Sequence, residues 1–269
     1  MTRSTPLLDQ QVSFGTQSAS DIAAIGAEEG SVLVIPVGSI EQHGEHLPVM
    51  TDTLLANSVA IAAAKRVVDD IPVLVTPSVR PGYSPHHLSF GGTLSASFEA
   101  LLNLLRDTAN TGLSNGFDAL VLVNGHGGNT PLINAAVSEI GATHSETEIL
   151  GLTYFELVAD LVEKVRQSDV GGMAHGGEFE TSMMLHLFPE LVDTEEMPAT
   201  YWDEHYDLGG KDLVSGGPLS VYRTFDEYSD SGAVGDPSLA DESTGKQLFD
   251  GTTQALADLL TEVHEQNID

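Results

Sequence analysis

The chain contains no cysteine, which excludes disulfide bridges, thiolate nucleophiles and thiolate metal ligands. A metal site in this protein must therefore be built from His, Asp and Glu. Long apolar runs are also missing, since none approaches the roughly 18 residues that a membrane-spanning helix needs. The first residues, MTRSTPLLDQQVSF, lack the apolar stretch of a secretory signal. We therefore expect a cytoplasmic protein that contacts no membrane.

Basic residues are scarce, with 10 Lys and Arg against 40 Asp and Glu, for a net charge of −30. This balance argues against nucleic acid and anionic lipid as partners, because both require cationic surfaces. The carboxylates are spread through segments that also carry periodic apolar residues, which argues against an acidic disordered tail. Spread acidity is typical of halophilic proteins, which live in molar salt, where the Debye length is about 3 Å. We predict an acidic, salt-adapted protein.

The apolar content of 41% suffices for a substantial core, and we expect a single domain over residues 1–269. Short runs rich in Val, Ile and Leu have the composition of buried parallel strands, at residues 31–37, 72–78, 118–124 and 148–153. Helical patterns lie between or after them, over Thr53–Lys65, from an N-cap at Ser97, and over Leu248–Val263. The alternation predicts an α/β fold, a single three-layer domain whose mainly parallel sheet is covered by helices on both faces. Ligands of such sheets bind at the carboxyl ends of the strands.

Chemically active side chains follow the first predicted strand. Glu41 and His43 are two residues apart, so an extended segment points both side chains to the same side. Asp52 opens the next helix and can turn back toward them. Taken alone, Asp52 is an ordinary N-cap. Together the three side chains place oxygen and nitrogen ligands around one point.

Two further segments add candidates. Asn124-Gly125-His126-Gly127-Gly128 follows the third strand, and its glycines permit a tight turn that leaves His126 exposed at the strand end. His175 precedes an apolar helix, and Glu180 lies near the first turn of that helix, within reach of a cation. Any one of these residues has a commonplace explanation, and their joint occurrence in Gly-containing loops favours a metal site. The candidate ligands are Glu41, His43, Asp52, His126 and Glu180.

The segments GSIEQHGEHLP (with the following TD), VLVNGHGGN and AHGGEFETSMMLHLFPELV resemble the three signature blocks of the creatininase family, in matching order. The resemblance extends from about Ser31 to Gly235-Asp236-Pro237. It implies a creatininase-like fold and a hydrolase of carbon–nitrogen bonds other than ordinary peptide bonds, usually assembled as a homo-hexamer. It also implies two divalent metal ions, for which we expect zinc first, with manganese or iron as the alternatives.

The resemblance gives each candidate a role. Glu41 and His43 match ligands of different metals, Asp52 matches a bridging carboxylate, and His126 matches a further ligand. His175 matches the substrate-facing His, which orients the substrate or protonates the leaving nitrogen. Pocket-lining positions of the family fall on Tyr83, His86 and Phe90. In this chemistry the two metals activate a water that attacks an amide carbonyl.

The chain departs from creatinine-hydrolysing members at two places. The turn after the metal-binding His carries a Tyr and a Glu ligand in those members, and here Gly127 and Gly128 stand instead. Either Glu180 supplies the missing oxygen, or only one metal is bound tightly. A Trp, an Asp and a Glu before the substrate-facing His are replaced by Gly171, Gly172 and Ala174.

These observations predict an amidohydrolase that acts on a small amide, such as the cyclic amide creatinine. Two alternatives are deformylation of a formylaminopyrimidine in flavin and deazaflavin synthesis, which Arg80 supports weakly as the only cation near these loops, and trimming of a small modified peptide. A non-enzymatic alternative is an inactive metal-binding subunit. Residues 198–230, which include Trp202, form either an excursion packed on the core, or a lid or subunit contact.

Overall fold

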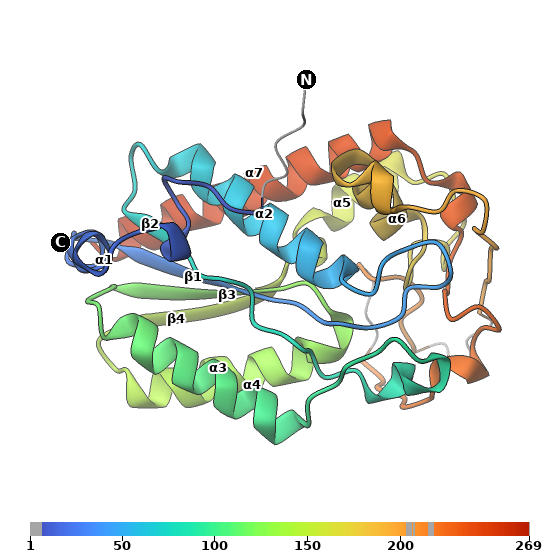
Figure 1. Ribbon diagram of the computed structural model, residues 1–269, viewed down its shortest axis with the longest axis horizontal. Helices are drawn as coiled ribbons and strands as arrows, with labels where there is room; N and C mark the ends of the chain where they lie inside the picture. The colour runs from blue at the N-terminus through green and yellow to red at the C-terminus, as the bar shows by residue number, and fades with distance from the viewer. Residues whose placement is uncertain (1–6, 203–205, 207, 215–217, 269) are drawn as a thin grey trace.

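The computed structural model describes residues 7–202, 206, 208–214 and 218–268. Its sheet has the order β2-β1-β3-β4, and every neighbouring pair is parallel. The strands are β1 (Val32–Val37), β2 (Val73–Val75), β3 (Ala119–Asn124) and β4 (Glu148–Thr153). Figure 1 shows this sheet between two layers of helices, which confirms the predicted fold class.

Alternate residues of each inner strand face opposite helical layers, because successive side chains of a strand point to opposite faces. Val32 and Val34 of β1 belong to the core beneath one layer, whereas Leu33 and Ile35 belong to the other. The first layer holds α2 (Thr51–Val67), α5 (Ala159–Val165), α6 (Glu178–Leu187) and α7 (Glu242–Gln266). The second layer holds α1 (Ala19–Gly26), α3 (Phe98–Leu113) and α4 (Thr130–Thr143).

The second strand is shorter than its apolar run. β2 ends at Val75, and the chain rejoins the sheet only at Val79, through an isolated bridge to Val37. Pro77 interrupts the segment, since it has no N–H to donate to a neighbouring strand. β4 has its predicted bounds but is only partly buried, because it forms the edge of the sheet.

The predicted helices lie within longer ones. Ser97 caps α3, as expected, by accepting a hydrogen bond from the Ala100 N–H (3.2 Å). Thr53–Lys65 lies within α2, and Asp52 is the second residue of that helix rather than its N-cap. The Asp52 carboxylate is therefore free to face the ends of the strands.

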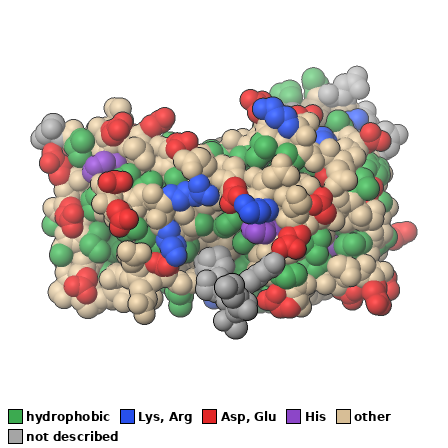
Figure 2. Space-filling model, turned by 90° about the horizontal axis from the view of Figure 1, so that it is seen from above, with side chains coloured by type: hydrophobic (Ala, Val, Ile, Leu, Met, Phe, Trp, Pro, Cys, Tyr) green, Lys and Arg blue, Asp and Glu red, His purple; other side chains and the backbone are tan. Residues whose placement is uncertain are grey.

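Acidic side chains are scattered over the molecular surface rather than gathered in one segment. Figure 2 shows Asp and Glu side chains at many separate points of one face, with few Lys and Arg side chains among them. Within the described part of the chain, no helix combines the length and apolar character that a membrane crossing needs. Of the segment 198–230, residues 203–205, 207 and 215–217 lie outside the described residues.

Candidate metal centre

All five predicted ligands meet in one buried region beyond the carboxyl ends of β1 and β3. Glu41 and His43 follow β1, and His126 follows β3. Asp52 lies in the first turn of α2, and Glu180 in the first turn of α6. None of these five residues is more than 4% exposed. Ligand atoms from these residues form two groups compact enough to hold a cation, one of which also includes His175.

The carboxylate of Asp52 connects the two groups. Its Oδ2 lies 3.3 Å from His126 Nδ1, which is itself 3.0 Å from Glu41 Oε1. Its Oδ1 lies on the other side, 2.9 Å from His43 Nε2. Glu180 Oε1 is 3.7 Å from the same His43 nitrogen. Asp52 thus has the position of a carboxylate shared between two cations.

Hydrogen bonds hold the outer atoms of these side chains in place. His43 Nδ1–H donates to the backbone oxygen of Glu41 (3.0 Å), which turns Nε2 toward Asp52. The Ser84 hydroxyl donates to Glu41 Oε2 (2.5 Å), and the Gly176 N–H donates to Glu180 Oε2 (2.6 Å). The remaining oxygen of each carboxylate is left facing the histidines. Such outer contacts orient metal ligands in proteins.

Two buried oxygen atoms support a cation at this place. Glu41 Oε1 and Asp52 Oδ2 are shielded from water, and their polar contacts among the described residues are to histidine nitrogens only. A buried carboxylate oxygen is costly unless a proton or a cation compensates its charge. Both atoms face His126 Nδ1. Oxygen and imidazole nitrogen in this mixture suit zinc, manganese or ferrous iron. The residues at this place therefore fit a divalent cation.

The electrostatics of the centre also favour positive charge. Burial lowers the pKa of His126, but Glu41 and Asp52 outweigh it and raise that pKa to about 10. Burial likewise opposes the charge on His43, and Asp52 and Glu180 overcome it, so its pKa lies well above the usual value. Burial would raise the pKa of Asp52, yet the two histidines hold it well below its usual range. Protons on His43 and His126 thus supply the positive charge that cations would otherwise bring to the carboxylates.

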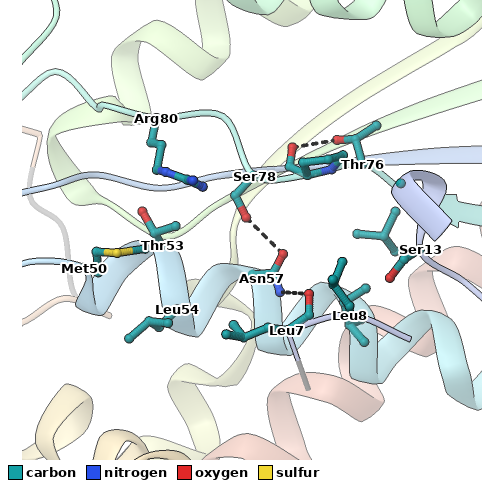
Figure 3. A pocket seen from close by; sticks show the side chains of 14 residues that line it. Leu7, Leu8, Ser13, Met50, Thr53, Leu54, Asn57, Thr76, Ser78 and Arg80 are labelled. Atoms are coloured by element: carbon teal, nitrogen blue, oxygen red, sulfur yellow. Dashed lines mark hydrogen bonds between the residues drawn. The ribbon is translucent and has the colours of Figure 1, made fainter. Parts of the chain in front are cut away.

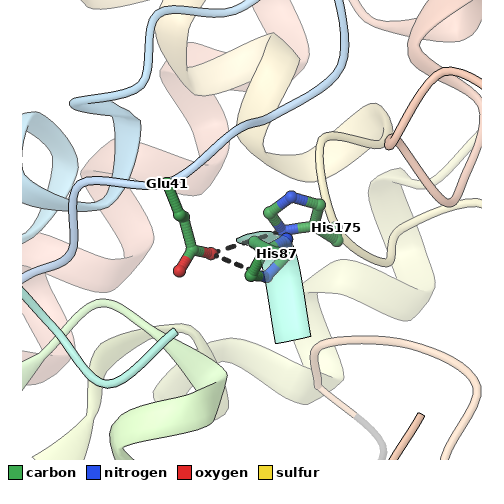
Figure 4. Close-up of side chains that lie close together, drawn as sticks. All are labelled: Glu41, His87 and His175. Atoms are coloured by element: carbon green, nitrogen blue, oxygen red, sulfur yellow. Dashed lines mark ion pairs between the residues drawn. The ribbon is translucent and has the colours of Figure 1, made fainter. Parts of the chain in front are cut away.

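His175 and His87 flank Glu41 (Figure 4). Both histidines are also hydrogen-bonded to Gln42. His175 Nε2–H donates to the Gln42 backbone oxygen (2.6 Å), so its bare Nδ1 faces Glu41 Oε1 at 3.6 Å. The Gln42 amide nitrogen donates to the Gly232 oxygen (2.9 Å) and to His87 Nδ1 (2.8 Å). His87 therefore carries its proton on Nε2, 3.2 Å from Glu41 Oε1. Burial lowers the pKa of both histidines, which keeps them neutral.

His87, Ser84 and Gln42 belong to the site, and no motif in the sequence predicts them. Of the three pocket positions that were predicted, His86 stacks on the His126 ring at 5.7 Å. The Tyr83 backbone oxygen lies 3.2 Å from His126 Nε2, while its ring packs on Phe98. Phe90 is half-buried at the end of the 3-10 helix η2 (Pro85–Phe90), which also carries His86. None of the three positions lines the cavity that opens beside His175.

The turn after β3 differs from the sequence expectation in one respect. His126 is only 4% exposed, because Tyr83 and Ser84 lie against its ring. Gly128 lies so close to it that an added Cβ would stand 2.4 Å from His126 Nε2. A side-chain ligand at position 128 is incompatible with this arrangement. Glu180 lies in the His43 group, and Glu41 provides the carboxylate next to His126.

A cavity of about 370 Å³ opens beside His175 and Gly127, with walls from Trp202, Phe225 and Tyr228. The described part of the 198–230 segment therefore borders the candidate site. Arg80 lines a different cavity of about 230 Å³ along α2, with Asn57 and Ser78 (Figure 3). No candidate metal ligand lines that second cavity.

Comparison with known proteins gives consistent matches. The family described as creatinine amidohydrolase (creatininase) matches residues 16–260. The mycofactocin precursor peptide peptidase of Mycobacterium ulcerans is 32% identical over 92% of this chain and 88% of its own length. The creatinine amidohydrolase of Pseudomonas putida is 29% identical over 95% of this chain and 98% of its own. A creatininase structure with manganese superposes with a TM-score of 0.78 at 26% identity, covering 94% of this chain and 98% of that one.

Proposed function

Because the chain belongs to the creatininase family, we propose that its buried centre holds two divalent metal ions and that the enzyme uses them to hydrolyse an amide. The family assignment makes the protein a hydrolase of carbon–nitrogen bonds. The observation that supports two ions is the position of Asp52, whose oxygens face different groups of ligands. Glu41, Asp52 and His126 lie close enough together to hold one ion. His43 and Glu180 would hold the other, with Asp52 Oδ1 beside the same His43 nitrogen.

Divalent ions at such a centre polarise a carbonyl and make bound water acidic enough to attack at neutral pH. His175 has the features of the proton carrier. It is neutral, its Nε2–H is held by the Gln42 backbone oxygen, and its bare Nδ1 faces the centre. We propose that Nδ1 accepts a proton during attack and delivers it to the leaving nitrogen.

For the metals, we expect zinc first, with manganese or iron as the alternatives, because these ligands exclude only the softer metals. The solved creatininases include a manganese and a zinc–zinc form. With Glu180 in the His43 group, each ion would have three protein residues, one of them shared. Three protein ligands and an open position are typical of catalytic zinc.

For the substrate, we favour an amide in a small peptide over creatinine itself. The cavity beside His175, at about 370 Å³, is of the size that holds drug-sized ligands. The relative at 32% identity acts on a precursor peptide, which supports the same substrate class here. Creatinine remains the second candidate, because a full-length relative at 29% identity hydrolyses it. Arg80 lends no support to the formylaminopyrimidine, since it lines the other cavity.

The assembly of the protein and its cellular environment are also matters of proposal. We propose a homo-oligomer, supported by exposed apolar side chains such as Tyr206, Leu208 and Tyr222. Cytoplasmic location, salt adaptation and the absence of nucleic-acid and membrane partners remain predictions from composition. Light scattering of the protein in molar potassium chloride would give the subunit number.

The test is removal and return of metal. Protein purified in molar salt is treated with a chelator, divided, and supplied with zinc, manganese or no metal. Each portion is assayed on creatinine, a formylaminopyrimidine and short peptides. We expect turnover of at least one amide that disappears with the metal and returns with it. Full turnover by the chelated, metal-free portion would contradict the proposal, and bound metal without turnover of any amide would favour the inactive subunit.

A further inference from the structure

The residues that line the cavity beside the metal centre indicate which kind of substrate fits there. We infer that it binds the part of the substrate next to the scissile amide, and that this part carries an aromatic or bulky apolar group together with a carboxylate, as a short peptide does. The inference rests on the proposed amide hydrolysis and deepens it. Three features of the described residues support it, namely an open floor, an aromatic wall and an unpaired cation.

The floor is open at Gly127. This residue directly follows the candidate ligand His126 and lines the cavity. A Cβ built on Gly127 would have no atom within 4 Å, and its φ is not in the left-handed region. Its neighbour Gly128 is the opposite case, because a Cβ there would collide with His126. The space at Gly127 is therefore available to a ligand, and a larger side chain would fill it without strain in the backbone.

The wall is aromatic and contacts His175 and His87. Phe225 packs edge-on to His175 with ring centroids 4.8 Å apart, and its ring lies 4.0 Å from that of His87. Tyr228 contacts both Phe225 (5.5 Å) and Trp202 (4.3 Å). The three aromatic rings form a continuous apolar surface that begins at His175. Such a surface favours a ligand with an aromatic or bulky apolar side chain.

The cation is Lys211, which lines the same cavity. Most of the few cations in this chain are paired with carboxylates, for example Arg166 with Asp212 at 3.1 Å. Lys211 has no ion-pair or hydrogen-bond partner in the part of the chain that the structure describes. An unpaired ammonium beside an active-site cavity, in a protein of net charge −30, is suited to hold a ligand carboxylate.

Glu156 also lines the cavity, where its carboxylate can contact a hydrogen-bond donor of the ligand. Burial raises its pKa, and its carboxylate can accept an N–H. Glu156 is exposed to solvent, so an anion without a donor group can still bind, and an N–H group on the ligand adds a further contact. A peptide has both a terminal carboxylate and amide N–H groups, and so matches both charged side chains.

Trp202 can report ligand binding by its fluorescence, because it is the only tryptophan of the chain and lines the cavity. Its fluorescence can be followed while the metal-loaded, full-length protein is titrated with ligands that have no amide to hydrolyse. The first is 3-phenylpropanoate, which has a ring and a carboxylate. The second, 3-phenylpropan-1-ol, lacks the charge, and the third, butanoate, lacks the ring.

We expect saturable binding of 3-phenylpropanoate, and binding of the other two that is weaker by about tenfold or more, the loss for one charge-assisted hydrogen bond or one buried ring. Lys211→Met should weaken 3-phenylpropanoate by about the same factor and leave the alcohol unchanged. Lys164→Met is the matched control, because Lys164 is exposed on α5 away from the cavity. Gly127→Leu should abolish binding of both ring compounds, while Gly127→Ala should not.

The outcome separates this inference from the proposed function. If 3-phenylpropanoate binds equally well to the wild type, Lys211→Met and Gly127→Leu while metal-dependent turnover persists, the inference is wrong and the proposed function stands. If the titrations follow the expected pattern but turnover does not depend on metal, the proposed function fails and the ligand class stands. Metal content of each variant, measured in parallel, shows whether Gly127→Leu has disturbed His126.

Discussion

Asp52 joins the two groups of ligands, because its oxygens lie 2.9 Å from His43 and 3.3 Å from His126. Asp52→Ala should therefore lower the bound metal more than replacement of either histidine alone. It should also reduce kcat by more than about a hundredfold, since loss of residues that only support metal ligands already costs 10–100-fold. Elemental analysis and turnover test this, with Glu45→Ala, an exposed carboxylate of the same loop, as the control. Wild-type turnover in Asp52→Ala would refute the shared carboxylate.

Glu180 belongs to one side of the centre only. Its Oε1 faces His43, and its Oε2 accepts from the Gly176 N–H. Glu180→Gln keeps the size of the side chain and removes its charge, so we expect about one metal equivalent to be lost and the ion beside His126 to stay. Stoichiometry after prolonged dialysis measures this. An unchanged metal content would remove Glu180 from the ligand set.

The raised pKa of His126 predicts how the stability of the protein depends on pH when the metal is removed. Its pKa is about 10 in the folded protein, above the unfolded value of about 6.5. The stabilisation is therefore complete below pH of about 6.5 and disappears as pH rises through about 10. Asp52, whose pKa is lowered, contributes equally throughout this window. Chelated protein should lose more than about 1 kcal/mol of unfolding free energy between neutral and alkaline pH.

Urea unfolding of the chelated protein at both pH values measures this loss. The metal-loaded protein is the comparison, because there the ions take the place of the protons and the same loss is not expected. Equal stability of the chelated protein at the two pH values would show that His126 is not protonated in the folded, metal-free state.

The elements explain how Glu180 reaches the centre. α6 carries Glu180 and packs along α7, and at Gly245 of α7 an added Cβ would lie 1.8 Å from the Ser182 backbone oxygen. Gly245→Ala must push the helices apart, so we expect destabilisation by about 1–3 kcal/mol and weaker metal binding on the Glu180 side. Gly251→Ala in the same helix is the matched control, since its Cβ would meet side chains rather than backbone, chiefly the end of Leu161, which can move aside.

Chemical denaturation and metal titration of both variants test this helix contact. The control should change stability little, because Ala also favours the helix over Gly. Wild-type stability and metal affinity in Gly245→Ala would show that the close approach of α6 and α7 does not set the position of Glu180.

The elements also show what the sequence could predict. Apolar runs and helical periodicity are local, so the strands at 118–124 and 148–153 and the cap at Ser97 were predicted nearly to the residue. The five metal candidates could be named because they follow strands or begin helices. His87 could not be distinguished from His86, because the direction of each ring depends on the turn of a short 3-10 helix. Phe225 reaches His175 across 50 residues of chain, and no local pattern predicts such a contact.

At the scale of the whole molecule, the net charge of −30 determines the response to salt. Repulsion among scattered carboxylates acts over about 10 Å at 0.1 M salt and over about 3 Å at 1 M. We expect the thermal midpoint to rise substantially from dilute to molar potassium chloride. Glycine betaine at equal osmolality is the control, because it does not screen charge. A midpoint that is indifferent to potassium chloride, or that betaine raises equally, would contradict salt adaptation through screening.

A two-metal centre in this protein requires a cation on either side of Asp52. Anomalous diffraction from crystals grown with zinc or manganese locates such ions directly. We predict two peaks, one among Glu41, Asp52 and His126 and the other between His43 and Glu180 on the Oδ1 side of Asp52. A single peak, or peaks away from the Asp52 carboxylate, would contradict the two-metal centre proposed for this enzyme.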